Sequence, residues 1–156
     1  MLYDSLAAAN EIREFRIRSL NGQLVEFDRI HATHTILNDD DSFSFAYFEM
    51  QEDRSAFVAN GIAAREHYRK LRTFDVEADR IDLIYYSAIP WVSFTSIKHA
   101  SRLDNSMTVP RIVFGKYFDQ GDQLMMPVSV EANHSIMDGV HVGRFYRRFQ
   151  ELLDSV

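Results

Sequence analysis

The sequence predicts an α+β domain in which a mixed sheet is packed by helices, and three observations lead to this class. Short apolar alternations recur along most of the chain, whereas helical spacing of apolar residues is found in residues 53–72 and after residue 138. Prolines and glycines number only 3 and 6, so the elements have few breaks. The length, 156 residues, is that of one domain.

Composition excludes several functional classes. Hydrophobic residues make up 46% and charged residues 26% of the chain, as in soluble globular proteins. The net charge of -6 argues against a nucleic-acid partner, because a phosphate-binding surface needs basic residues. No apolar run approaches the roughly 20 residues of a membrane span. Cysteine is absent, which excludes disulfides and cysteine zinc sites, and no signal peptide is readable, so we expect a cytoplasmic protein.

The first half of the chain predicts a hairpin, two further strands and a helix. Asn21-Gly22, between residues 14–18 and 23–27, is typical of a type I′ turn, whose central residues both have positive φ. Residues 29–37 predict a strand, 38–41 a solvated turn, and 43–47 a strand with an aromatic face. In residues 53–72 the helical spacing predicts an apolar stripe of Phe57, Val58, Ile62, Tyr68 and Leu71.

The second half predicts four strands and a terminal helix. Apolar runs at 81–89 and 91–97 are separated by Pro90 and followed by a polar loop at 98–108. Residues 109–118 and 123–132 predict two more strands, and Pro127 places the second at an edge or a bulge. Asp138 is expected to cap the last helix, whose apolar stripe consists of Val142, Phe145, Phe149, Leu152 and Leu153.

His134 is the first candidate for chemistry. It stands at a strand-to-helix junction, which is a rigid mount, and a neutral imidazole can act as a general base at cellular pH. A structural histidine in a turn explains the same pattern, and helix capping alone explains Asp138.

Other chemical patterns are weaker. His31 and His34 are three residues apart in a predicted strand, so they point to opposite faces and we expect no metal site there. Ser87 lies in a predicted strand without the GxSxG elbow of the serine hydrolases. Neither a Walker loop nor a GxGxxG loop is present, so nucleoside triphosphates and dinucleotides are not expected as ligands.

Four ordered blocks of the second half carry a family resemblance. They are PWVSFTS (90–96), GKYFDQGD (115–122), LMMPVSVEANHSIMDG (124–139) and VHVGRF (140–145). His134 and Asp138 form the His-x-x-x-Asp-Gly pattern of acyl-CoA-dependent acyltransferases. Together the blocks resemble the type A chloramphenicol acetyltransferases. The resemblance implies a two-layer α/β sandwich, a homotrimer with active sites between subunits, and acetyl transfer from acetyl-CoA to a hydroxyl of a small molecule, without a metal.

The resemblance also implies roles for individual residues. His134 would take the proton of the acceptor hydroxyl, Ser87 would donate a hydrogen bond to the tetrahedral oxyanion, and Asp138 would hold the histidine loop in place. The coenzyme would lie against Lys116 and Tyr117, with the tyrosine ring on the adenine. Trp91 would lie near the channel for coenzyme and acceptor, although packing in the core explains this residue as well.

The sequence departs from the family pattern in three places. Asn133 stands where the family often has a first histidine. The expected acceptor-binding positions hold His99, Ser101, Arg111 and Val113, and the first three make the pocket more polar, so the acceptor is chloramphenicol or a more polar molecule. The family's N-terminal strand, helix and strand, which precede the part matching residues 5–18, have no counterpart. That segment carries the arginine that pairs with the motif aspartate.

Two functional hypotheses follow from the resemblance. The first is an acetyl-CoA-dependent O-acetyltransferase, which retention of His134, Ser87 and Asp138 favours. The second is a non-catalytic trimeric relative that binds a ligand, which the short N-terminus favours. The short N-terminus itself leaves three alternatives: the chain is a fragment, another group replaces the missing arginine, or the activity is impaired.

Overall fold

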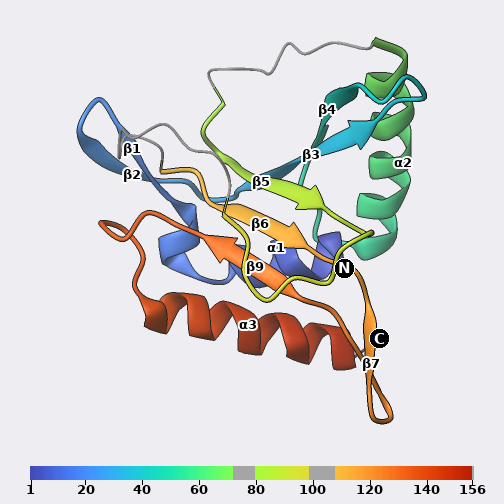
Figure 1. Cartoon of the computed structure of the whole chain (residues 1–156). Coiled ribbons are helices and arrows are strands. Elements are labelled where there is room, and N and C mark those ends of the chain that lie inside the picture. The colour runs from blue at the N-terminus through green and yellow to red at the C-terminus, as the bar shows by residue number, and fades with distance from the viewer. Residues whose placement is uncertain (72–79, 99–107, 156) are drawn as a thin grey trace.

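The computed structural model describes residues 1–71, 80–98 and 108–155. In these ranges a five-stranded mixed sheet forms the centre and three α-helices pack against it (Figure 1). The helices are α1 (Leu2–Asn10), α2 (Arg54–Leu71) and α3 (Gly139–Asp154), and a short 3₁₀ helix, η1, spans Arg13–Arg16. The expected α+β class is confirmed.

The central sheet has the strand order β4-β3-β5-β6-β9. Its strands are β3 (His31–Leu37), β4 (Phe43–Phe48), β5 (Leu83–Ala88), β6 (Arg111–Phe114) and β9 (Val128–Glu131). Strands β3, β5 and β6 are parallel, whereas β4 and β9 run antiparallel to their neighbours. Two hairpins stand apart from this sheet: β1 (Ile17–Leu20) with β2 (Gln23–Glu26), and β7 (Phe118–Gln120) with β8 (Gln123–Met125).

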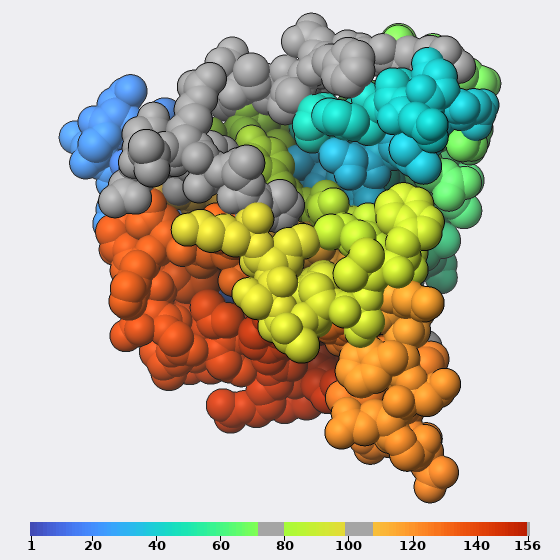
Figure 2. All heavy atoms as spheres, viewed as in Figure 1, coloured from blue at the N-terminus to red at the C-terminus, as the bar shows by residue number. Residues whose placement is uncertain are grey.

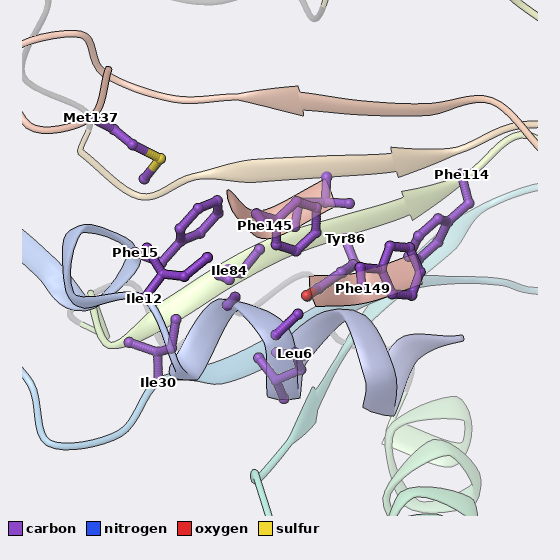
Figure 3. Packing of buried hydrophobic residues seen from close by; sticks show 14 of the residues in the cluster. Leu6, Ile12, Phe15, Ile30, Ile84, Tyr86, Phe114, Met137, Phe145 and Phe149 are labelled. Atoms are coloured by element: carbon purple, nitrogen blue, oxygen red, sulfur yellow. The ribbon is translucent and has the colours of Figure 1, made fainter. Parts of the chain in front are cut away.

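One face of the central sheet carries the hydrophobic core. Because side chains alternate across a strand, Ile84, Tyr86, Ile112 and Phe114 share the face on which helices α1 and α3 pack (Figure 3). The ring of Phe149 on α3 lies 6.2 Å from that of Phe114. The opposite face therefore holds the alternate residues of β5 and β6, together with Thr33 of β3: Tyr85, Ser87, Arg111 and Val113.

Local predictions hold where turn chemistry decides the structure. The type I′ turn of the first hairpin is confirmed, since φ is 52° at Asn21 and 78° at Gly22. The hairpin is shorter than predicted, because residues 13–16 form a 3₁₀ helix that places Phe15 in the core. Pro127 does not lie inside a strand as predicted: it falls in the break between β8 and β9, just before the outer strand of the central sheet.

The strand predicted at 91–97 is wrong. After Pro90 the chain turns, with the Val92 N–H donating to the Ile89 carbonyl, and no strand forms there. The long strands predicted at 109–118 and 123–132 each divide into two short ones, because the chain leaves the sheet between β6 and β9 to make the β7–β8 hairpin.

Helix α2 is confirmed, but its buried face is narrower than predicted. It packs on the edge strand β4 along a line that includes Phe57 and Gly61, and a methyl group on Gly61 would lie 3.3 Å from the Phe48 ring. Val58 and Ile62 lie off this line and are 50% and 56% exposed.

A fully buried guanidinium joins the first hairpin to the central sheet. Arg18 donates hydrogen bonds to the carbonyl oxygens of Phe15, Ile17, Ile81 and Leu83, at 2.6 to 2.8 Å. Burial lowers the pKa of Arg18 to about 10, so the group still carries its charge at neutral pH. The four carbonyls replace the water that the charge loses, and they tie the start of β5 to β1.

Arg18→Met should destabilise the fold strongly. Each buried carbonyl left without a donor costs about 1–3 kcal/mol, so we expect the free energy of unfolding to fall by at least about 3 kcal/mol in urea titrations. Arg13→Met, which removes an exposed arginine beside the same hairpin, is the matched control. Equal losses in the two variants would show that the buried network contributes no more than the exposed ion pair.

Candidate active site

The loop between β9 and α3 is held by one asparagine side chain. The Asn133 carboxamide oxygen accepts hydrogen bonds from the backbone N–H and the hydroxyl of Ser135, at 3.0 and 2.7 Å. The Asn133 carbonyl accepts from the N–H groups of Ile136 and Met137, both at 3.0 Å. Asparagine therefore shapes the turn that carries His134, a role that the sequence analysis did not assign to it.

His134 is held in one tautomer by this loop. Its Nδ1 lies 3.3 Å from the carbonyl oxygen of Met137. Because a carbonyl can only accept, Nδ1 carries the proton and Nε2 keeps its lone pair. Met137 is buried in the core near Phe15 and Phe145, so the accepting carbonyl belongs to an anchored residue (Figure 3). The His134 side chain itself is exposed, so its basic nitrogen is accessible from outside the chain.

Asp138 caps helix α3, as predicted. Its carboxylate accepts a hydrogen bond of 2.6 Å from the Gly139 N–H, and its own N–H donates to Nδ1 of His141 at 2.9 Å. The side chain is exposed and forms no ion pair with any residue that the structure describes. Exposure leaves the carboxylate hydrated, so a missing ionic partner does not impose the penalty of a buried charge.

Ser87 and His134 lie toward opposite ends of the sheet. Ser87 is the penultimate residue of β5 and is in register with Val113 of β6 and Ser129 of β9. Strand β9 runs against β5 and β6, as the arrowheads in Figure 1 show, and His134 follows its far end. A single chain therefore does not bring the predicted base and the predicted oxyanion donor together.

The predicted coenzyme residues lie at the same end of the sheet as Ser87. The N–H of Lys116 donates to the Val92 carbonyl at 2.9 Å, so the loop after β5 is fastened to the segment after β6. Trp91 and Tyr117 are 70% and 51% exposed. Beside this loop, the β7–β8 hairpin stands out from the body of the molecule (Figure 2). Two accessible rings and a lysine form a surface on which a flat, anionic ligand can stack.

The predicted acceptor residues are only partly described. His99 and Ser101 lie outside the described residues. Arg111 and Val113 lie on the sheet face opposite the core, and the Arg111 guanidinium is 3.8 Å from the Glu131 carboxylate across the β6–β9 pair. The arginine charge is thus balanced, which makes this part of the face polar without a net positive charge.

The two histidines of β3 are structural. Nδ1 of His34 donates to the Thr35 carbonyl, which assigns the tautomer of that ring. Nδ1 of His31 lies 2.9 Å from the Met50 nitrogen and 2.8 Å from the Glu49 carboxylate, so its backbone and carboxylate neighbours hold that ring in place. Burial lowers the pKa of each; for His31 the carboxylates Glu49 and Asp82 oppose this effect. No cluster of three or more metal-ligating side chains occurs within the described ranges. Nor does any helix there combine the length and apolarity that crossing a membrane requires.

A family model described as chloramphenicol acetyltransferase matches residues 1–150. The chain belongs to the chloramphenicol acetyltransferase family. The resemblance and the fold expected from it are therefore confirmed.

Individual members of the chloramphenicol acetyltransferase family are similar over most of the chain. A chloramphenicol acetyltransferase of Escherichia coli is 31% identical over 143 residues, which are 90% of this chain and 65% of the relative. Chloramphenicol acetyltransferase 3 of Escherichia coli is 29% identical over 157 residues, covering 99% of this chain and 74% of the relative. The chain thus spans 65% to 74% of the length of these two proteins.

Solved structures agree with the family assignment. A chloramphenicol acetyltransferase superposes with a TM-score of 0.82 at 28% identity, covering 97% of this chain and 75% of that one. A dihydrolipoamide acetyltransferase of Azotobacter vinelandii has a TM-score of 0.73 at 19% identity over 97% of this chain and 66% of its own, which is a likeness of fold.

Asp138→Ala should destabilise the protein by about 1 kcal/mol, the usual effect of losing an N-cap, in thermal or urea unfolding. Asp138→Asn should keep most of that stability, because an asparagine oxygen also caps. If both variants unfolded like the parent, the observed cap would have no energetic role.

Stability should fall as the pH falls below about 6.5, the pKa of an unfolded histidine. The folded pKa values of His31 and His34 lie lower, so the unfolded chain binds more protons in this range and protonation favours it. The loss of unfolding free energy between pH 7.5 and 5.5 should be smaller in His34→Leu than in the parent. His67→Gln, on the exposed side of α2, is the control, and identical pH slopes for the parent and His34→Leu would contradict the assignment.

Proposed function

We propose that this protein is an O-acetyltransferase that moves the acetyl group of acetyl-CoA to a hydroxyl of a small molecule. The observation that carries the proposal is the tautomer of His134. Its Nδ1–H is engaged by the Met137 carbonyl, and its exposed Nε2 is free to accept a proton. Membership of the chloramphenicol acetyltransferase family supports acetyl transfer as the reaction in which this base takes part.

The reaction proceeds by direct attack, without an acyl-enzyme. Nε2 of His134 removes the proton of the acceptor hydroxyl while its oxygen attacks the thioester carbonyl. The Ser87 hydroxyl donates to the oxyanion of the tetrahedral intermediate; one such donor commonly contributes about 3 kcal/mol to transition-state stabilisation. Collapse breaks the carbon–sulfur bond, and the imidazolium returns its proton to the leaving thiolate. The products are the acetyl ester and free coenzyme A.

The active site is assembled between copies of the chain in a homotrimer. The support for this is the position of Ser87 and His134 toward opposite ends of one sheet. One copy supplies Ser87 with Trp91, Lys116 and Tyr117, which hold the coenzyme, and its neighbour supplies His134. The neighbour's Asp138 keeps the histidine loop in place by capping the helix behind it.

The acceptor is chloramphenicol or a more polar molecule. Arg111 and Glu131 support the polar alternative, because an apolar ring laid over an ion pair removes its water without replacing the hydrogen bonds. A hydroxylated acceptor with further donors and acceptors can replace them. Val113 is in register with Ser87 and is its apolar neighbour, but its side chain is buried within the chain at 2% exposure.

Release of coenzyme A thiol from acetyl-CoA tests the activity. The parent should release thiol only when an acceptor is present, and His134→Ala should abolish that release while its circular dichroism spectrum stays unchanged. The protein itself contributes no thiol, because it lacks cysteine. Acceptor-dependent release that persists in a folded His134→Ala protein would remove His134 as the base. No release with chloramphenicol or with any polar acceptor of a hydroxyl panel would remove the proposed activity.

Mixing two inactive variants tests the shared site. In trimers assembled at random from equal amounts of Ser87→Ala and His134→Ala chains, about a quarter of the interfaces combine an intact serine with an intact histidine. Coexpression should therefore restore about that fraction of the activity. The control replaces one of the two chains by the double variant Ser87→Ala/His134→Ala, which should restore no activity. Failure to recover activity in a mixed trimer would place the whole site within one chain.

A further inference from the structure

Three of the four sequence blocks that carry the family resemblance meet at one glycine. Gly115 opens the second block, Phe94 lies in the first and Pro127 in the third. A methyl group on Gly115 would lie 2.6 Å from Cγ of Pro127 and 2.8 Å from Cε1 of Phe94. Contacts this short do not occur between carbon atoms in folded proteins, so neither neighbour leaves room for a side chain.

The requirement for glycine here comes from packing rather than from backbone conformation. The positive-φ glycines of the described chain are Gly22 and Gly121, and Gly115 is not among them. The two groups above it are also stiff, since one is a pyrrolidine ring and the other an aromatic ring. Any residue larger than glycine must therefore move the chain segments that carry these rings.

Backbone hydrogen bonds connect this contact to the surface rings. The Gly115 N–H donates to the Pro127 carbonyl and the Lys116 N–H to the Val92 carbonyl, both at 2.9 Å. The Ile89 N–H donates to the Phe114 carbonyl at 2.8 Å. The loop that carries Trp91 is thus hydrogen-bonded to the residue before Gly115 and to the residue after it. The segment Lys116–Tyr117 directly follows Gly115.

We propose that Gly115 is the positioning residue of the coenzyme subsite. Its missing side chain lets Phe94 and Pro127 close on the end of β6, and this closure sets the spacing between the Trp91 ring and the Tyr117 ring. The role rests on the proposed function, because that function places coenzyme A on these rings. Gly115 touches no reacting atom and acts through the two segments that it brings together.

Fluorescence of Trp91 tests this role without relying on turnover, because Trp91 is the one tryptophan of the chain. Coenzyme A should quench the parent's emission, and Gly115→Ala should raise the dissociation constant obtained from this quenching by about tenfold or more. In kinetics the same variant should raise the KM for acetyl-CoA much more than it lowers kcat, since His134 and Ser87 are untouched. Acrylamide quenching without coenzyme should also change, because the loop itself moves.

Two variants separate crowding from general damage. Gly143→Ala is the matched control, because a methyl group at that exposed position on α3 meets no atom within 4 Å. Gly115→Ala combined with Phe94→Val and Pro127→Ala removes the colliding atoms and should restore most of the coenzyme affinity. If Gly115→Ala does not fold, Phe94→Ala is tested in the parent: it leaves a gap above Gly115 that no methyl group fills, unlike in the triple variant, and the lost contact should weaken coenzyme binding.

The outcomes distinguish this role from the proposed function. A parent whose emission does not respond to coenzyme A would overturn the coenzyme site and the role of Gly115 with it. A responding parent with an unchanged dissociation constant in folded Gly115→Ala would overturn only the role of Gly115. The same conclusion would follow if the triple variant folded but bound coenzyme no better than Gly115→Ala.

Discussion

The direction of one strand decides where the chemistry of this chain can take place. Because β9 runs against β5 and β6, the residues after β9 emerge at one end of the sheet, whereas those at the end of β5 emerge toward the other. His134 lies just beyond the first of these ends, and Ser87 lies close to the second. No rearrangement of a short loop exchanges the ends of a hydrogen-bonded sheet, so a site that needs both residues takes them from two chains. For the proposed enzyme, assembly of at least two chains is then a requirement of the chemistry, and in the proposed trimer each site would lie between two subunits.

Each half of such a site has to be rigid in its own chain, and the structure achieves this in two different ways. In the loop that carries His134, hydrogen bonds provide the rigidity. The Asn133 oxygen closes the turn, the Met137 carbonyl selects the tautomer, and Asp138 caps the start of the helix. On the serine side the means is close packing, with two rings pressed on Gly115. Hydrogen bonds orient one nitrogen, as the proposed base requires, whereas close packing holds a broad surface, as the proposed coenzyme subsite requires.

What the sequence predicted correctly was encoded locally. The Asn21-Gly22 turn, the stripe on the last helix and the Asp138 cap each depend on a few neighbouring residues. Helix α1 was missed because two polar residues, Asp4 and Ser5, are buried beside its apolar inward residues and interrupt the apolar stripe. Only the folded chain brings Arg54 and Tyr86 to pair with them. Residues 91–97 alternate like a strand, yet Trp91 and Val92 are exposed, which indicates that their apolar surface is not used for this chain's own core.

The same distinction separates the predicted part of the site from the missed part. His134 and Asp138 could be identified because their motif lies in one contiguous stretch, which contains both the proposed base and the observed helix cap. From the sequence, Asn133 was interpreted only as the replacement of a histidine. Its role, which is to accept two hydrogen bonds from Ser135, is visible only in the folded loop. Gly115 looked like any small residue before Lys116, because Phe94 and Pro127 are 21 and 12 residues away in sequence. Residues that position others carry their information in contacts between segments, so their roles become visible only when the segments are brought together.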